Sequence, residues 1–380
     1  MVIKRILFFI FLPVFIFSLS ITVNAEETNA APEDYEDLLE AVPDDIAELL
    51  PDGIFSSDMD EIGAAVQEAT SWEYIWNVVF DLIGLNLKDA LKIFAEISGL
   101  LVLCSLLNML KNTIKNENLS SILTLVGSVV IASAIVEMAK TPLDRINLFF
   151  EQLKTLVNTM TPMICSLYAM GGNVSTAVVQ NYGMMMFLTI FENICIGALQ
   201  LILGICLALA VSSAFMPNMN LKPLSDAIKK TFTFFIGLVM LIFSTVLSTQ
   251  TLLSSKADSL SAKTAKMFAG QMIPLVGGTV GDTLRTAGAS IEYLRSTVGT
   301  GIIIIFLLLV LPTVLSVWGF RLSFIASNAV SGLLGCEQEG RMVSEIASIY
   351  GYILAIVSIC SVVLLFLLTL FVRCSSAISG

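Results

Sequence analysis

Few residues in this sequence could do chemistry, and histidine is absent. Without an imidazole, the chain lacks the usual base of Ser-His and Cys-His catalysis and the commonest zinc ligand. Its seven cysteines form no Cys-x-x-Cys pair and lie mostly in apolar segments, which is typical of small apolar side chains rather than of redox or metal ligands. No Gly-x-x-x-x-Gly-Lys-Ser/Thr motif is present, so any energy input must come from ion gradients or another subunit. The sequence therefore predicts a protein that is not an enzyme and that binds no cofactor and no metal.

One carboxylate lies where ionisable groups are rare. Glu192 falls inside the long apolar run Tyr182–Phe215, and an ionisable residue at membrane depth is by default a functional candidate. If the span begins near Ile194 instead, Glu192 lies at the membrane interface and needs no special role. Both interpretations stay open at this point.

The other candidates are helix-breaking residues that recur in two copies of one pattern. Proline stands eight positions after lysine in both copies, and a Gly-Gly pair and a long apolar run follow. A Ser-acid motif then opens a further apolar helix in each copy, at Leu224–Ile228 and at Val343–Ala347. Membrane proteins built from repeats often place their function near broken helices at the seam between the copies, although plain turns would give the same pattern. The candidate positions in the two breaks are Pro162, Gly171, Gly172, Lys266, Gly270, Pro274, Gly277, Gly278 and Asp282.

Composition decides the class of protein that must position these residues. Hydrophobic residues make up 56% of the 380-residue chain, charged residues 13%, and the mean hydropathy is +0.88. This is more apolar surface than a soluble core can hide. We therefore predict an all-α integral membrane protein: a polytopic helical bundle with an internal duplication and two Pro/Gly-interrupted amphipathic or re-entrant segments.

Spanning helices need roughly twenty apolar residues. Six runs qualify: Ala90–Leu110, Leu119–Met138, Tyr182–Phe215, Thr231–Leu252, Gly299–Val317 and Tyr350–Val372. Two amphipathic stretches, Arg145–Gly172 and Lys256–Arg295, could be re-entrant or interfacial, or could add a seventh and an eighth span.

The N-terminal part reads as an export signal followed by an acidic segment. Residues 1–25 have a basic start, an apolar core and a small-residue cleavage site, although an uncleaved anchor is the alternative. Residues 26–89 hold eighteen acidic residues and one lysine, which argues against binding nucleic acid. Within them Val42, Ile46, Leu49 and Leu50 form a narrow apolar stripe on a short predicted helix. We expect this stripe to dock on the membrane body or, as our working hypothesis, on a partner; a solvated acidic linker is the alternative.

Loop charge predicts the orientation. With the acidic segment outside, Lys111 and Lys115 lie inside, as the positive-inside rule prefers, and the two copies become parallel repeats. The predicted units are residues 1–25 (signal), 26–89 (acidic extracytoplasmic segment), 90–140 (helical hairpin), 141–253 (first repeat), 254–373 (second repeat) and 374–380 (C-terminal tail).

Several motifs resemble one known family. Val42–Asp45 and Glu48–Asp52, then Ser261–Phe268, Ile273–Gly278 and Asp282, are similar to the stage III sporulation protein AE family, and the resemblance covers nearly the whole chain. It implies a multi-pass protein of the mother-cell membrane around the forespore, part of a channel or secretion-like complex needed for forespore development and late forespore gene expression. It also implies partners: other stage III sporulation membrane proteins of the same operon, including a cytoplasmic ATPase and ring-forming subunits, and a forespore-membrane protein. No catalytic residue carries over.

Two mechanisms remain open from the sequence. In the first, the chain is a non-enzymatic subunit of a multi-protein channel. In the second, it is a self-sufficient secondary transporter for a small solute, with a site near Pro162, Glu192 and Pro274. The small number of charges inside the predicted spans favours the first.

Overall fold

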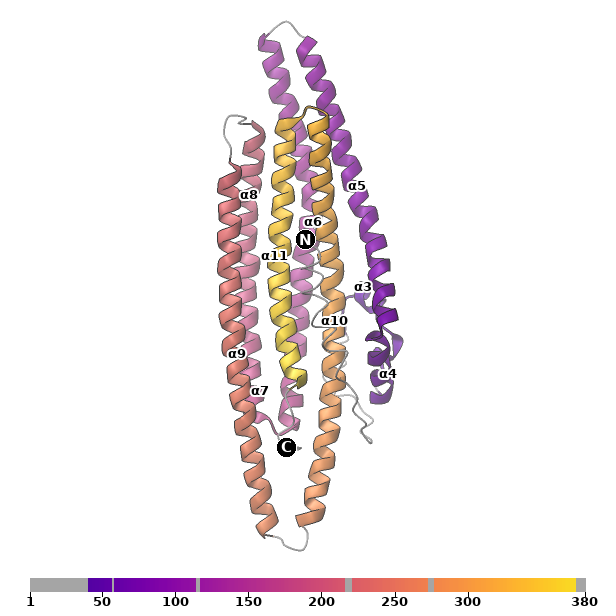
Figure 1. Ribbon diagram of the computed structural model, residues 1–380, viewed down its shortest axis with the longest axis vertical. Helices are drawn as coiled ribbons and strands as arrows, with labels where there is room; N and C mark the ends of the chain where they lie inside the picture. The colour runs from indigo at the N-terminus through magenta and orange to yellow at the C-terminus, as the bar shows by residue number, and fades with distance from the viewer. Residues whose placement is uncertain (1–39, 57, 114–116, 216–220, 273–276, 374–380) are drawn as a thin grey trace.

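The chain folds into a bundle of very long helices (Figure 1). The computed structural model describes residues 40–56, 58–113, 117–215, 221–272 and 277–373. The short N-terminal elements are α3 (Asp44–Ala47), the 3-10 turn η1 (Asp52–Phe55) and α4 (Met59–Ala69). The bundle is made of α5 (Trp72–Thr113), α6 (Glu117–Met170), α7 (Val174–Ile190), the π-helical segment η2 (Phe191–Gly197), α8 (Ala198–Phe215), α9 (Lys222–Met272), α10 (Gly277–Leu333) and α11 (Glu337–Arg373). The predicted all-α polytopic membrane fold is confirmed.

Five helical segments are long and apolar enough to cross a membrane: Trp72–Leu110, Val174–Ser212, Lys222–Thr264, Ala289–Leu333 and Glu337–Val372. They contain five of the six predicted spans, apart from the last residues of Tyr182–Phe215. The remaining one, Leu119–Met138, lies in α6, but the side chains of 119–125 are outside the described set, so this span stays a prediction.

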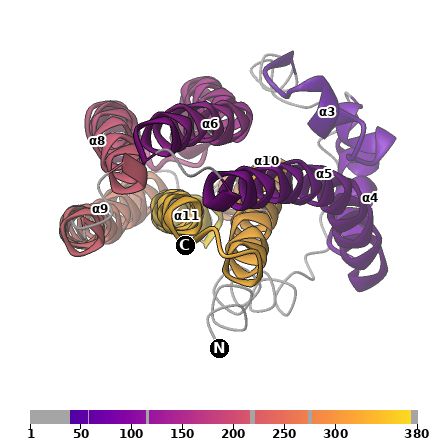
Figure 2. The ribbon, with the colours of Figure 1, turned by 90° about the horizontal axis from the view of Figure 1, so that it is seen from above.

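Helices α10 and α11 form the centre of the bundle. Of their most apolar stretches 72% and 61% are buried inside the protein, against 17% to 25% in the other three candidate spans. Viewed from above, α6, α8 and α9 lie around α11, while α5 and α4 lie beside α10 (Figure 2). The outer helices are therefore the ones that meet lipid or partner proteins.

Hydrogen bonds between helices place the apolar runs at two different heights. The Ser323 hydroxyl donates to the carbonyl of Ala90 (2.5 Å), and the Ser105 hydroxyl donates to the carbonyl of Leu334 (3.1 Å). The Tyr350 hydroxyl donates to the carbonyl of Ala139 (2.8 Å). Residues 90–113 and 117–138, which we call the upper hairpin, thus lie beside the upper parts of α10 and α11, from the height of Ser323 and Tyr350 up to the turn between these helices, and extend beyond it at the top of Figure 1.

The apolar runs of α9, α10 and α11 share a lower level, from Tyr350 down to Phe371 on α11. The ring of Phe371 lies 5.2 Å from that of Tyr168, so the end of α6 marks the bottom of this level. A helix rises 1.5 Å per residue, so this level is about 32 Å high, close to the hydrocarbon thickness of about 30 Å. The α5 helix crosses the lower level with residues 72–89, which expose Trp76 and Phe80 on their outer face.

Charged side chains separate the two levels. Arg145 Nη1 lies 2.7 Å from Asp89 Oδ2, and Lys140 Nζ lies 2.6 Å from a carboxylate oxygen of Glu137. Both pairs are largely exposed, with side-chain exposures of 42% to 72%, and exposed charges are costly inside hydrocarbon. These exposed charges mark the boundary between the two levels.

The two stretches predicted to be interrupted behave differently from one another. Arg145–Gly172 is an unbroken helix to Met170 that runs the full height of the lower level, so the expected break at Pro162 is wrong. The Pro162 ring is exposed on the helix surface, and membrane helices tolerate such prolines because neighbouring groups satisfy the backbone. The break comes at Gly171-Gly172, where Gly172 has φ 76°, a conformation that favours glycine.

The described part of Lys256–Arg295 forms the lower thirds of α9 and α10, which extend below the other helices in Figure 1. Residues 273–276, with Pro274, lie outside the described set. The predicted unit boundaries at 89/90, 140/141 and 253/254 all fall inside continuous helices, so the predicted units share elements.

The N-terminal elements pack on the bundle itself. Val42, Ile46 and Leu50 are 2% to 6% exposed and belong to the core, while Leu49 packs against it. The Tyr74 hydroxyl donates to the carbonyl of Leu49, and α3 and α4 contact α10. The apolar stripe is thus covered by its own chain: docking on the membrane body is observed, and the expectation that these residues present a free docking surface for a partner is corrected.

Candidate functional site

The carboxylate singled out by the sequence, Glu192, lies in an unusual element. It is the second residue of η2, a π-helical segment between α7 and α8. Its Oε1 accepts a hydrogen bond from Lys154 Nζ on α6 at 2.7 Å. Lys154 is midway along the part of α6 between Ala139 and Tyr168, so this ion pair lies at mid-height of the lower level. Segments of π-helix are rare and occur frequently at functional sites.

The Lys154–Glu192 pair belongs to a polar face on the outside of the bundle. On α6, Glu151, Thr155 and Asn158 are exposed, whereas Leu153 and Leu156 on the opposite face are buried. We call the outward side chains of Glu151, Lys154, Thr155, Asn158 and Pro162 the α6 stripe. On the neighbouring helix, Asn181, Thr189, Glu192 and Asn193 are exposed as well.

The polarity of this face is the reverse of what lipid requires. A helix in contact with lipid turns apolar side chains outward, as α9 does with Phe234, Leu238 and Leu241. The α6 helix instead turns its apolar face inward and its polar face outward at the same depth. This surface is suited to water or to a polar protein surface.

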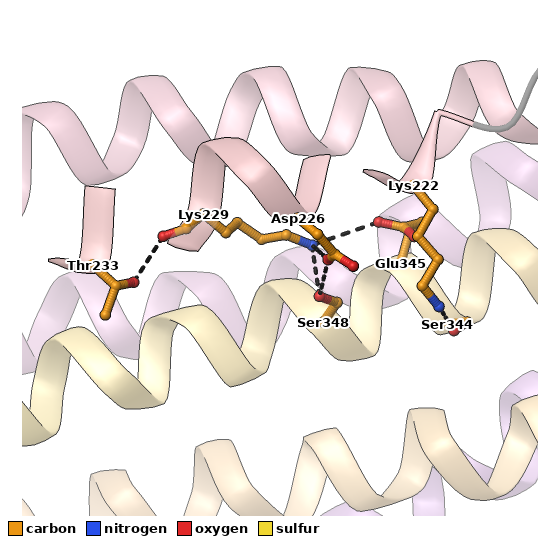
Figure 3. Close-up of polar contacts among 7 residues, drawn as sticks. All are labelled: Lys222, Asp226, Lys229, Thr233, Ser344, Glu345 and Ser348. Carbon is orange, nitrogen blue, oxygen red and sulfur yellow. Dashed lines mark hydrogen bonds and ion pairs between the residues drawn. The ribbon is translucent and has the colours of Figure 1, made fainter. Parts of the chain in front are cut away.

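A second polar site is buried between α9 and α11 (Figure 3). The Lys229 side chain is 5% exposed, and its Nζ donates to Ser348 Oγ at 2.6 Å. The same ammonium group lies 3.2 Å from Asp226 Oδ1 and 3.5 Å from Glu345 Oε2. The Ser348 hydroxyl also donates to Asp226 Oδ1 at 3.2 Å, and Lys222 Nζ donates to Ser344 Oγ at 3.3 Å.

This cluster joins the two Ser-acid motifs that the sequence repeats. Asp226 comes from the first motif and Glu345 from the second, and both carboxylates face one lysine. The helices that carry them run side by side in the same direction, as the parallel arrangement of the two copies predicted (Figures 1 and 3). Burial of charges brings little net stability, but a mismatch would leave a buried charge unpaired, so the cluster fixes the register of α9 against α11.

The Gly171-Gly172 turn is held by a residue that sequence reasoning missed. Asp258 of α9 is 7% exposed and accepts from the first turn of α7. Its Oδ1 receives the Ser175 N–H at 3.2 Å, and its Oδ2 receives both the Thr176 N–H at 2.9 Å and the Thr176 hydroxyl at 2.8 Å. A carboxylate from another helix thus caps the start of α7 and suits the positive end of its dipole.

The other predicted positions lie apart from Glu192. Pro162 is part of the α6 stripe, two turns below Lys154. Lys266 and Gly270 are in the last turns of α9, and Gly277, Gly278 and Asp282 are in the first turns of α10, all near the lower ends of these helices. Their side chains and Pro274 are outside the described set, so a shared site with Glu192 stays untested.

Two further polar residues were missed because, like Asp258, they make their contacts with residues far away in the sequence. Arg295 is 1% exposed and places its guanidinium 5.8 Å from the centre of the Tyr168 ring. Lys154 recurs in the repeated Lys–Pro spacing, which was the only signal of its role. Contacts across more than thirty residues, such as Lys154–Glu192, leave no local pattern in one sequence.

Comparison with known proteins assigns the family. The family model for stage III sporulation protein AE matches residues 57–377, which include every helix of the bundle. None of the curated proteins and none of the solved structures matches the chain. Together with the multi-pass helical architecture, this match makes the chain a sporulation protein of the membrane that belongs to the stage III sporulation protein AE family.

Proposed function

We propose that this chain is a non-enzymatic, multi-pass membrane subunit of a channel or secretion-like complex between mother cell and forespore. It would reside in the mother-cell membrane around the forespore and be needed for forespore development and late forespore gene expression. Family membership supports a role in sporulation. In this proposal the bilayer surrounds the lower level, whose height of about 32 Å is close to the hydrocarbon thickness of about 30 Å. The observation that carries the channel role is the α6 stripe, a polar surface on the outside of the bundle at that level.

The α6 stripe cannot face lipid without cost. Exposed Glu151, Lys154 and Asn158 would meet hydrocarbon in an isolated subunit, and ionisable residues within membranes characteristically line water-filled pathways or face other protein. In an assembly the stripe lines the conduit, and the Lys154–Glu192 pair contributes both signs of charge to its wall. The conduit is then shared between subunits rather than enclosed by one chain.

The upper hairpin supplies the surface for partners. Its side chains Leu103, Leu106, Met109 and Val130 are 51% to 65% exposed, and with the bilayer at the lower level they would stand in water. Contiguous apolar surface in water marks a protein interaction site. The basic residues at this end, including Lys222, Lys230 and Arg341, favour the cytoplasmic side by the positive-inside rule, which supports a position of the acidic N-terminal segment between the membranes.

The partners proposed for these surfaces are the other stage III sporulation membrane proteins of the same operon. The cytoplasmic ATPase and the ring-forming subunits have access to opposite ends of the bundle, and a forespore-membrane protein would complete the passage. The chain would thus draw its driving force from a neighbour.

Deletion of the gene tests the biological role. We expect normal vegetative growth, then arrest of the engulfed forespore with a silent late forespore transcription reporter. Normal spores combined with a growth or uptake defect would refute the proposal and favour a self-sufficient transporter.

Thiol labelling in sporulating cells tests the conduit. In a variant whose native cysteines are replaced, cysteine at Thr155 or Asn158 should react with a water-soluble methanethiosulfonate at least about tenfold faster than cysteine at Phe234 or Leu241, because the reactive thiolate forms in water and not in hydrocarbon. All four positions are exposed on the bundle and two of them face lipid in this arrangement. Equal, slow labelling of all four would contradict a water-filled space beside α6.

The Lys154–Glu192 pair also favours one alternative, a secondary transporter, because ion-coupled transporters use ionisable residues at mid-depth. Vesicles that contain only the purified protein distinguish the two. Solute uptake that is lost in Glu192→Gln would support the transporter, and no uptake with either protein would rule it out.

A further inference from the structure

Two cysteines and a glutamate from segments far apart in the sequence meet where α5 passes the turn between α10 and α11. The ligand atoms of Cys104, Cys336 and Glu339 all lie within 4.8 Å of one another. The three residues are buried, with exposures of 2%, 1% and 7%. The side-chain amide nitrogen of Asn108 lies 3.8 Å from Cys104 Sγ and 4.0 Å from Cys336 Sγ.

Backbone structure holds this cluster in place. Cys336 directly precedes α11, and its carbonyl accepts the N–H of Gly340 at 2.9 Å, so it is the N-cap of that helix. Glu339 is three residues further on, and side chains at the N-cap and at the third helical position meet at a helix start. Gly335, with φ 71°, makes the turn from α10 into this start.

The third ligand comes from α5, which is fixed against the same turn. The Ser105 hydroxyl donates to the carbonyl of Leu334 at 3.1 Å, and Cys336 Sγ lies 3.5 Å from the carbonyl oxygen of Leu101. These contacts aim Cys104 at the N-terminus of α11. Two separate segments of the chain thus build the cluster, and this is also how structural metal sites tie elements together.

We propose that Cys104, Cys336 and Glu339 bind one Zn²⁺ ion. Two thiolates and one carboxylate are a donor set for zinc, whereas magnesium and calcium take oxygen ligands. In a tetrahedral zinc site with Zn–S bonds of about 2.3 Å, the two sulfur atoms lie about 3.8 Å apart, so the ligands need only small shifts to close on the ion. The Asn108 side-chain amide, rotated to present its oxygen, supplies the fourth ligand.

The electrostatic setting suits this ion. Three anionic ligands and Zn²⁺ leave one net negative charge, which the positive end of the α11 dipole stabilises. Without a metal ion, the buried carboxylate of Glu339 would lie beside two thiols, and apolar packing does not stabilise a buried charge. The basic residues at this end of the bundle favour the cytoplasm, where thiols stay reduced and a disulfide between Cys104 and Cys336 is disfavoured.

Zinc content tests the site in the full-length protein purified in detergent. We expect about one zinc per chain by mass spectrometry of the metal, and an increase in melting temperature when Zn²⁺ is restored after chelation. Cys104→Ser, Cys336→Ser and Glu339→Gln should each weaken Zn²⁺ binding by more than about 100-fold, since loss of an outer-shell partner alone costs roughly 10–100-fold. Cys165→Ser, which removes a thiol on α6 away from the cluster, should bind like the original protein.

Cobalt distinguishes a true site from weak surface binding. At Co²⁺ concentrations that saturate each variant, bound Co²⁺ should show thiolate-to-metal charge transfer that falls by half in either cysteine variant and persists in Glu339→Gln. The Glu339→Gln variant keeps both thiols and so gives a result even where the serine variants fold poorly. Zinc content that is equal in all variants, a cobalt spectrum without thiolate charge transfer, or a Cys104–Cys336 disulfide in the non-reduced protein would each overturn the proposal.

Discussion

Replacing Lys229 with methionine should destabilise the protein by about 3–5 kcal/mol, because it leaves the buried carboxylate of Glu345 and the partly buried carboxylate of Asp226 without their cation. Lys229 is 5% exposed and lies 3.2 Å and 3.5 Å from the two carboxylates, so water cannot replace it. The measurement is thermal unfolding of the detergent-purified protein, followed by tryptophan fluorescence.

Two further variants make this result specific. Lys230→Met removes the exposed neighbouring charge and should leave the melting temperature unchanged. Adding Asp226→Asn and Glu345→Gln to Lys229→Met removes all three charges and should recover most of the loss, since an uncharged cluster has no unpaired ion to bury. A single variant as stable as the original protein would show that the cluster does not fix α9 against α11.

Replacing Asp258 with alanine should cost about 3 kcal/mol, because three hydrogen bonds to one buried carboxylate are lost and hydrogen bonds to charged groups contribute about 1.5–3 kcal/mol each without being additive. The Ser175 and Thr176 N–H groups would lose their acceptor at the start of α7. The expected result is a lower melting temperature together with faster proteolysis at the Gly171-Gly172 turn.

Matched variants separate the cap from a general effect of mutation in α9. Asp258→Asn keeps an acceptor for one N–H and should lose less stability than alanine. Lys256→Ala, at an exposed position two residues earlier, should have no effect. If proteolysis at Gly171-Gly172 is unchanged in Asp258→Ala, the carboxylate does not hold this turn.

The sequence predicted helices well because long apolar runs have few alternatives to a helix in a membrane. Gly299–Val317 and Tyr350–Val372 lie in α10 and α11 as expected. Hydropathy says nothing about relative depth, however, so Ala90–Leu110 and Leu119–Met138 were predicted as spans level with the rest. Their position above the charged pairs Arg145–Asp89 and Lys140–Glu137 follows only from contacts between helices.

Candidate sites that lie within one short segment of the sequence were predictable, whereas sites formed by contact between distant segments were not. Glu192 was recognisable because a carboxylate in an apolar run is unusual, and Gly171-Gly172 because glycine pairs end helices. The repeated Ser-acid motifs were visible as a pattern, but the contact of Asp226 and Glu345 with one lysine was not. Cys104 and Cys336 were interpreted as apolar residues because their positions, over two hundred residues apart, reveal nothing of their meeting.

The length of α6 has a mechanical consequence. Its 54 residues make a rod of about 81 Å, so a tilt of about 5° about one end moves the other end by about 7 Å. The same rod carries the exposed apolar side chains of Val126, Val129 and Val130 in the upper hairpin and the α6 stripe in the lower level. In the proposed complex, a partner that pulls the upper end of α6 sideways would therefore move the α6 stripe directly, as a lever does, without any signal having to travel through side-chain repacking.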